Sequence, residues 1–377
     1  MSEMTFHNRM QTWVKRVYQQ KNVWFLKHLV ACIADMAVGM SLSHSVQLPQ
    51  LATWLPFAAQ NSSTVRRFER LLADERLNAY KYWVPFVRAM QTTLGPQQIV
   101  LVIDSTKVGR CCRSIFVGIL YHGTILPIGF KTIKGAKGHA TAEVHLALLK
   151  LIYPQWCNYR DVVLLGDSEF CSKPVLDWLK DKGWHGVFHL SNQHHVRLGR
   201  AEPWQQPEEV IKAAKITKGQ VTYWRDVSYT QKHNLPGLTM IAHWDASYQK
   251  PLHLLSTLPP EAQPEQLYEQ RYWIEPSFRN LKSSGFNLNQ THLTEPAQID
   301  RLLLCVAVAT AFILGVATDI LLTRQTKLVD RSDRRDLSLF QIGRRALLRF
   351  INSAVLSQVR IIWDWGLELP PAGFIGT

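Results

Sequence analysis

The sequence predicts an α/β protein whose mixed-sheet core is interrupted by a β-strand insertion, with an all-helical N-terminal domain and a helical C-terminal region. Three observations lead to this prediction. Residues 1 to about 95 carry apolar side chains at helical spacing, short β-branched runs begin at residue 98, and strand-like and helix-like segments then alternate up to residue 190. The 377 residues suffice for several domains, which we place at 1–95, 96–190, 191–262, 263–322 and 323–377.

Within the N-terminal helical region, the stretch NSSTVRRFERLLADERL predicts an amphipathic helix with a basic face. Its exposed side carries Arg66, Arg67 and Arg70. A short helix, a polar turn and a basic second helix are typical of a helix-turn-helix-like DNA reader, and we expect these arginines to contact DNA. A plain amphipathic helix with a solvated basic face is the alternative interpretation.

The charge balance indicates a polyanionic partner. Lys and Arg number 43 against 29 Asp and Glu, a formal net charge of +14, which favours nucleic acid. The six cysteines show no spacing typical of a zinc site or of a disulfide framework, and the first residues lack an apolar signal core, so we expect a cytoplasmic protein. Residues 302–318 carry no charge, and we expect a buried core helix there and no membrane partner.

From residue 98 onward, the order of segments predicts three strands followed by alternating helices and strands. The first strand is QIVLVIDST and the fourth is DVVLLGDSEF. This order matches the ribonuclease-H-like fold, in which the first and fourth strands are adjacent and parallel. Asp104 ends the first strand and Asp167 follows the fourth, so we expect both acids at the same sheet edge. Taken singly, each also suits an ordinary strand-ending turn.

Residues 191–262 interrupt the alternation. The runs QVTYWRDVSYT, LTMIAHWDAS and PLHLLSTL predict three further strands, which we interpret as a small β insertion between two parts of the core. The stretch LPPEAQPEQ then predicts a linker and the start of a helix.

The helix predicted at YEQRYWIEPSFRNLK carries a polar stripe. At about 100° per residue, Tyr268, Arg271, Glu275 and Lys282 fall within about 60° of one another. A solvated face with ordinary charge pairs is the alternative. Pro276 lacks an amide hydrogen, so we expect a kink or an irregular turn beside it.

Three carboxylates, two on neighbouring strand ends and one on a helix packed across them, are what a two-metal phosphoryl-transfer site needs. We therefore expect Asp104, Asp167 and Glu275 to be both catalytic and metal-binding. Hard oxygen ligands select Mg²⁺ or Mn²⁺ over Zn²⁺.

The unbroken spacing Tyr-x2-Arg-x3-Glu-x6-Lys, together with the two aspartates, resembles the insertion-sequence-four family of bacterial DDE transposases of the cut-and-paste type, over about residues 60–350. The resemblance implies that Asp104, Asp167 and Glu275 bind two Mg²⁺ ions, for which Mn²⁺ can substitute. It implies that Tyr268, Arg271 and Lys282 contact DNA phosphates. It also implies double-stranded transposon ends and target DNA as partners, and a homodimer in the synaptic complex.

Family members that form hairpin ends use an aromatic residue in the insertion to hold a flipped base. Here the strand PLHLLSTL offers His253, while Trp244 and Trp224 lie upstream, so the resemblance leaves the choice open. Two other functions stay as alternatives: a ribonuclease-H-like nuclease or resolvase, which needs the acids but not the stripe, and a catalytically silent helix-turn-helix DNA-binding protein.

Overall fold

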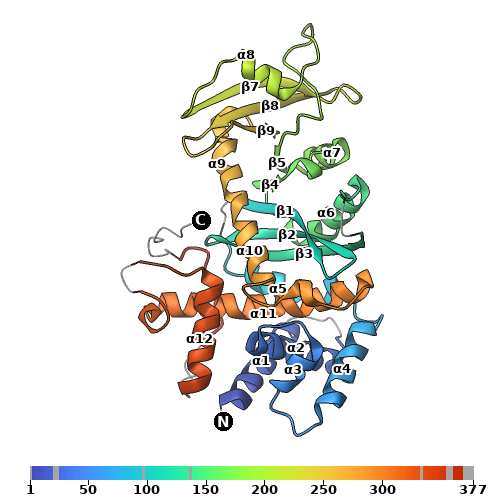
Figure 1. Cartoon of the computed structure of the whole chain (residues 1–377), viewed down its shortest axis with the longest axis vertical. Helices are drawn as coiled ribbons and strands as arrows, with labels where there is room; N and C mark the ends of the chain where they lie inside the picture. The colour runs from blue at the N-terminus through green and yellow to red at the C-terminus, as the bar shows by residue number, and fades with distance from the viewer. Residues whose placement is uncertain are drawn as a thin grey trace.

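The described part of the chain forms one mixed sheet of nine strands, with helices packed against it and a larger group of helices at one end (Figure 1). The computed structural model describes residues 2–19, 25–95, 98–135, 138–331, 334–353 and 360–367; residues 96 and 97, at a predicted domain boundary, and parts of the predicted C-terminal region lie outside them. The strands are β1 Ile99–Val108, β2 Cys112–Tyr121, β3 Thr124–Lys134, β4 Val162–Gly166, β5 His185–His189, β6 Val196–Arg197, β7 Gln220–Tyr229, β8 Leu235–Trp244 and β9 Leu252–Ser256. The α-helices are α1 Ser2–Gln19, α2 Lys27–Ser43, α3 Leu48–Thr53, α4 Asn61–Ala73, α5 Ala79–Gln91, α6 Ala142–Trp156, α7 Lys173–Lys182, α8 Pro207–Ala213, α9 Pro264–Glu269, α10 Ile274–Leu281, α11 Pro296–Leu322 and α12 Leu339–Ser353.

The strand order is β3-β2-β1-β4-β5-β9-β8-β7-β6. The predicted arrangement of the first and fourth strands is confirmed, because β1 and β4 are adjacent and parallel, with Ile103 opposite Gly166. β2 and β3 continue the sheet on one side as an antiparallel pair. The next residue along each central strand is an aspartate, so the register alone brings two acids to one sheet edge.

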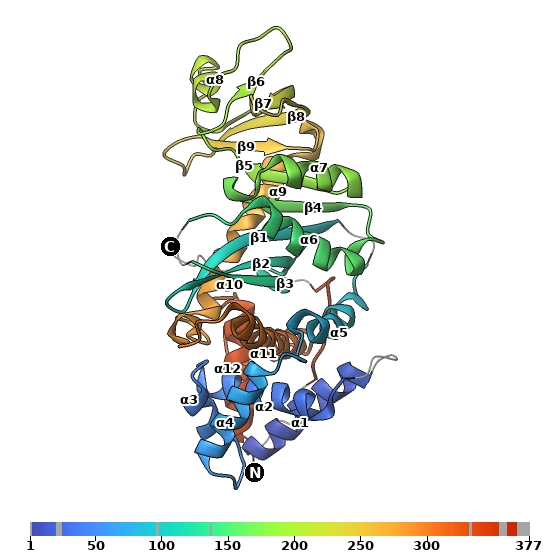
Figure 2. The same cartoon turned by 90° about the vertical axis from the view of Figure 1, so that its right-hand side faces the viewer.

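Both faces of the central strands are buried, which explains their continuous apolar runs. On β4, Leu164 belongs to the core that includes α6 and α7, whereas Val163 and Leu165 pack in a second cluster with Tyr268 and Ile274. Figure 2 shows the resulting layers, with α6 and α7 on the near side of the sheet and α9 behind it. The segment that carries the predicted polar stripe therefore crosses one face of the sheet.

The predicted β insertion contributes strands to the central sheet. β9 pairs antiparallel with β5, with Val187 opposite Ser256, so the strands of the insertion extend the central sheet (Figure 2). The pairing covers the edge of β5, whose unpaired amide and carbonyl groups would otherwise be exposed. The short strand β6 and the helix α8 were not predicted.

The segment from 264 to 282 is two α-helices joined by a 3₁₀ turn, η3 Gln270–Trp273, and not one continuous helix. An amide at position 276 would bond to the carbonyl of Tyr272 in a regular helix, but Pro276 has none. The expected irregularity is thus present as a 3₁₀ turn that ends three residues before the proline, which lies in the first turn of α10. Because the 3₁₀ turn has a different number of residues per turn, the angle between Tyr268 and Glu275 differs from that in a regular α-helix.

The helix α11 lies between the sheet and the N-terminal helices (Figure 1). Among the described residues it is the one helix long and apolar enough to cross a membrane, and its apolar window is fully buried in the protein. Arg301 ties it to the N-terminal helices by donating to the backbone carbonyls of Leu72 and Leu77. This burial is what the core-helix interpretation predicts.

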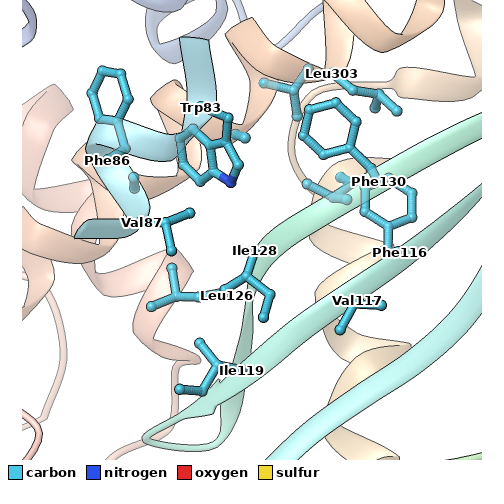
Figure 3. Packing of buried hydrophobic residues seen from close by; sticks show 14 of the residues in the cluster. Trp83, Phe86, Val87, Phe116, Val117, Ile119, Leu126, Ile128, Phe130 and Leu303 are labelled. Atoms are coloured by element: carbon cyan, nitrogen blue, oxygen red, sulfur yellow. The ribbon is translucent and has the colours of Figure 1, made fainter. Parts of the chain in front are cut away.

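Aromatic packing joins the N-terminal helices to the sheet (Figure 3). On α5, Trp83 stacks on Phe86 and donates its indole N–H to the carbonyl of Pro127 on β3, at 3.1 Å. Leu126 and Ile128 lie beside them in the buried cluster. The helical region and the sheet thus share one hydrophobic core.

Asp300 on α11 provides a pH-dependent test of the contact between α11 and β3. Its Oδ1 accepts the backbone N–H of Thr132 on β3 at 2.9 Å, and burial raises the pKa of its carboxyl to about 6. The folded state thus holds the proton more tightly than the unfolded state, and stability present below pH 4 is lost as pH rises through 6. Asp300→Asn keeps the acceptor and should remove this loss.

We expect the free energy of unfolding of Asp300→Asn to exceed that of the unsubstituted protein by about 1–3 kcal/mol at pH 8 and to equal it near pH 4. Urea denaturation across this range measures the difference. Asp177→Asn, at an exposed position on α7, is the matched control and should not alter the pH profile. A constant offset at every pH would contradict the assignment.

Candidate functional site

Two acids lie side by side at the ends of the central parallel strands. Asp104 is in β1, one residue beyond Ile103, and Asp167 directly follows β4. Gly166 permits this close approach, because a Cβ there would come within 2.9 Å of the Ile103 side chain. Each aspartate also accepts the N–H of its following serine at 2.7 Å, which orients the carboxylates at the edge.

A single guanidinium lies among three carboxylates. Arg271, on the 3₁₀ turn η3, places Nη2 at 3.2 Å from Asp104 Oδ2 and at 3.8 Å from Asp167 Oδ2. Its Nη1 is 3.9 Å from Oε1 of Glu275, in the first turn of α10. The Arg271 side chain is only 16% exposed, so these acids are its compensating charges. Residues 104, 167 and 275, far apart in sequence, therefore face one positive charge.

The two aspartates differ in their electrostatic environment. Burial raises the pKa of Asp104, although Arg271 and the Ser105 amide oppose the shift. The pKa of Asp167 is lowered to about 2, first by its interaction with His189 and then by the Ser168 amide and Arg271. Neighbouring acids whose pKa values move in opposite directions are typical of functional sites.

The other two residues of the predicted stripe, Tyr268 and Lys282, differ in their surroundings. Tyr268 is 8% exposed, and its ring centroid is 5.9 Å from the guanidinium carbon. The ring thus packs beside the Arg271 guanidinium, and the phosphate contact expected of Tyr268 stays a prediction. Lys282 directly follows α10 and is half-buried; burial lowers its pKa, while the charge of Asp104 acts in the opposite direction.

The donor set has the chemistry that hard divalent cations prefer. Asp104, Asp167 and Glu275 offer carboxylate oxygens, which Mg²⁺ and Mn²⁺ prefer, and all three already face one shared cation. In the described part of the chain, no group of three or more His, Cys, Asp or Glu side chains is close enough to hold one ion. The three acids therefore share Arg271 as a counter-charge and do not form a closed group around an ion position.

The three N-terminal arginines lie elsewhere. They are on α4, which Figures 1 and 2 both show beyond α11 from the central strands. Arg66 and Arg70 are exposed, but Arg67 donates to Oδ2 of the buried Asp35 on α2 at 2.7 Å. Arg67 therefore joins α2 to α4, and Arg66 and Arg70 are the arginines that α4 exposes to solvent.

The two candidate base-stacking residues line one cavity of about 410 Å³ in the insertion. Trp244 ends β8 and His253 lies on β9, and three lysines, Lys212, Lys215 and Lys250, line the same cavity. Burial lowers the pKa of His253 to about 4. Trp224, on β7, does not line it. An aromatic ring beside several lysines suits a nucleotide, whose base can stack and whose phosphate is anionic.

Sequence reasoning missed His189 and Glu169. His189 ends β5 and lies with Nδ1 at 3.4 Å from Asp167 Oδ1. β5 runs parallel to β4, so the edge argument that located the aspartates applies to it as well. Glu169 lies two residues beyond Asp167 in the stretch DSEF, and this closeness to a predicted site residue was the signal that could have identified it.

A double-mutant cycle measures the interaction between Arg271 and its acids. Arg271→Gln leaves three facing carboxylates without their cation, and Asp104→Asn removes one of those charges. We expect the destabilisation of the two substitutions to be non-additive by about 1–3 kcal/mol in urea unfolding at pH 7.5. The cycle of Lys282→Gln with Asp104→Asn is the control and should give a smaller coupling. Equal coupling in the two cycles would remove Arg271 from the centre of the site.

Comparison with known proteins identifies the family. Residues 95–312 match the sequence profile described as Transposase DDE domain, and no curated protein matches the chain. A cryo-EM structure of the piggyBac transposase synaptic complex with hairpin DNA is similar at 12% identity and TM-score 0.41, covering 92% of this chain and 77% of that one. Marinitoga piezophila Argonaute in complex with 5′ OH guide RNA and target DNA is similar at 11% identity and TM-score 0.25, covering 67% of this chain and 37% of that one. The catalytic domain of human endonuclease V is similar at 12% identity and TM-score 0.25, covering 62% of this chain and 95% of that one. The profile match spans more than half of the 377 residues and includes all three acids, and the chain therefore belongs to the transposase DDE domain family.

Proposed function

We propose that this protein is a cut-and-paste transposase of the insertion-sequence-four family, with a ribonuclease-H-like core. The single observation that carries the proposal is the convergence of Asp104, Asp167 and Glu275 on one cationic group, in a chain of the transposase DDE domain family. The adjacent, parallel β1 and β4 support the core assignment, and the spacing from Tyr268 to Lys282 supports the subfamily.

Asp104, Asp167 and Glu275 would hold two divalent ions, Mg²⁺ with Mn²⁺ able to substitute. Paired ions, when bound, supply charge stabilisation to the attacking and leaving oxygens of a phosphodiester displacement. Of the protein's own groups, Arg271 and Lys282 lie beside these acids and would bind DNA phosphates, while Tyr268 holds Arg271 in place. The insertion cavity leads us to propose hairpin ends, with Trp244 or His253 stacking on a flipped base.

The proposed reaction uses one site for successive attacks on phosphodiesters. Hydrolysis at the transposon end frees a 3′-hydroxyl, which attacks the opposite strand to form the hairpin. The hairpin is reopened, and the 3′ ends attack target DNA. Joining two ends makes a homodimer the simplest synaptic complex. In this proposal residues 1–95 bind DNA and the protein acts in the bacterial cytoplasm.

The acids are tested by isosteric replacement. Asp104→Asn, Asp167→Asn and Glu275→Gln should each reduce strand cleavage by at least about 1000-fold while leaving binding to the terminal repeat within a few-fold, because an amide cannot replace a charged metal ligand. Purified protein, Mg²⁺ and DNA ending in the native inverted repeat are incubated, and products are mapped on denaturing gels.

The matched control is Asp161→Asn at the other end of β4, which should cleave normally. Retained cleavage in any of the three variants would exclude that residue. The products also separate the alternatives: a nuclease or resolvase gives cleavage without joining to target DNA, and a silent DNA-binding protein gives neither.

The phosphate contacts are tested by salt dependence. We expect Arg271→Gln and Lys282→Gln to weaken end binding and to reduce the slope of log affinity against log salt by about 1 each, since each removes one phosphate neutralisation. Fluorescence anisotropy between 50 and 300 mM salt measures the slope. Lys180→Gln, at the exposed end of α7, is the control. An unchanged slope for the two site variants would make them purely structural.

A further inference from the structure

Glu169 is a buried acid that the proposed reaction does not use. It lies in the short 3₁₀ turn η1 Ser168–Phe170, two residues beyond Asp167, and its side chain is 9% exposed. An ionised carboxylate at that depth must be compensated by cations or hydrogen-bond donors. The surroundings of Glu169 supply several of them, from separate elements.

Both carboxylate oxygens of Glu169 are engaged. Oε1 accepts the backbone N–H of Ala140 at 2.9 Å and lies 3.3 Å from Arg113 Nη2 on β2. Oε2 lies 3.2 Å from His139 Nδ1 and accepts Ser105 Oγ at 3.5 Å. Nε2 of the buried His145, on α6, is 3.6 Å from Oε1, an ion-pair rather than a hydrogen-bond distance.

Ser105 and Glu169 lie close to the two aspartates along the chain. Ser105 follows Asp104 on β1, Glu169 follows Asp167 after β4, and Arg113 pairs with Lys107 across β1 and β2. Ala140 precedes α6, and α6 packs against the face of the sheet on which Leu164 of β4 lies. Glu169, two residues after Asp167, thus contacts the side chain of Ser105, directly after Asp104, and that of Arg113 on β2.

We propose that Glu169 is a positioning residue that fixes the separation of Asp104 and Asp167. The inference rests on the proposed function, because the separation matters only if the two acids share divalent ions. Both oxygens of Glu169 already have partners, and Arg271 is not among those the structure shows, so in this proposal it acts through its neighbours and not as a ligand. Groups that orient metal ligands in this way typically change metal affinity about 10–100-fold when replaced.

The test compares Glu169→Gln and Glu169→Asp with Glu295→Gln. The glutamine variant keeps the shape but loses the charge, and the aspartate variant keeps the charge but shortens the reach. Glu295 pairs with the exposed Lys134 outside the site and serves as the matched control. Three quantities are measured: the Mn²⁺ concentration for half-maximal end cleavage, the rise in thermal midpoint on adding Mn²⁺ without DNA, and metal-free binding to the terminal repeat.

Both Glu169 variants should need at least about 10-fold more Mn²⁺ for half-maximal cleavage and show a smaller Mn²⁺-induced rise in midpoint, with DNA binding within about 2-fold. The control should match the unsubstituted protein in all three. A folded Glu169 variant with an unchanged Mn²⁺ requirement would overturn the proposal, because a merely structural role lowers stability without moving metal dependence.

If neither Glu169 variant folds, Ser105→Ala tests whether Glu169 positions the aspartates. It removes one contact of Glu169 and should shift the Mn²⁺ requirement in the same direction by a smaller factor; no shift would overturn the proposal. Failure of the unsubstituted protein to cleave in Mn²⁺ would instead remove the proposed function, and with it this inference. The two failures are therefore distinguishable.

Discussion

Electrostatic compensation of three carboxylates by one guanidinium is the constraint on which the geometry of this protein depends. Parallel strands that end at one edge bring Asp104 and Asp167 together, and their mutual repulsion in a partly buried setting requires a cation. Arg271 supplies it from the 3₁₀ turn η3. The irregular turn, the proline after it and the buried Tyr268 ring can all be understood as parts that hold this one side chain.

The continuous sheet gives the site its surroundings. Because β9 pairs with β5, the insertion is joined to the central sheet beside the strand that ends at His189, and Leu190 N–H, just after β5, donates to the His253 carbonyl at 2.8 Å. His189, which faces Asp167, and His253, which lines the cavity, are thus on neighbouring strands.

The helix α11 binds the rest of the chain to the sheet. Arg301 connects it to the N-terminal helices, and Thr318 shares a hydrogen bond with Tyr121 at the end of β2. Near its C-terminus, the buried Asp319 accepts the backbone N–H of Arg360, so a segment late in the sequence is fastened to it as well. Because α11 is covered by these neighbours, no face of its apolar window is exposed to solvent, which explains the uninterrupted apolar run.

The sequence by itself determined the strands of the core, the parallel placement of β1 beside β4 and the position of Asp104 and Asp167. The reason is that the spacing of apolar residues and the order of the segments can both be read directly along the chain. It also located the buried helix α11 and the irregular turn before Pro276. Only the tertiary structure decided that β9 pairs with β5, that Arg67 is bound to Asp35, that Tyr268 is buried under Arg271 and that Glu169 joins the two strand ends. Each of these contacts joins residues that are far apart in the sequence. Such contacts produce no periodic pattern of residue types along the chain, so the sequence pattern could not predict them.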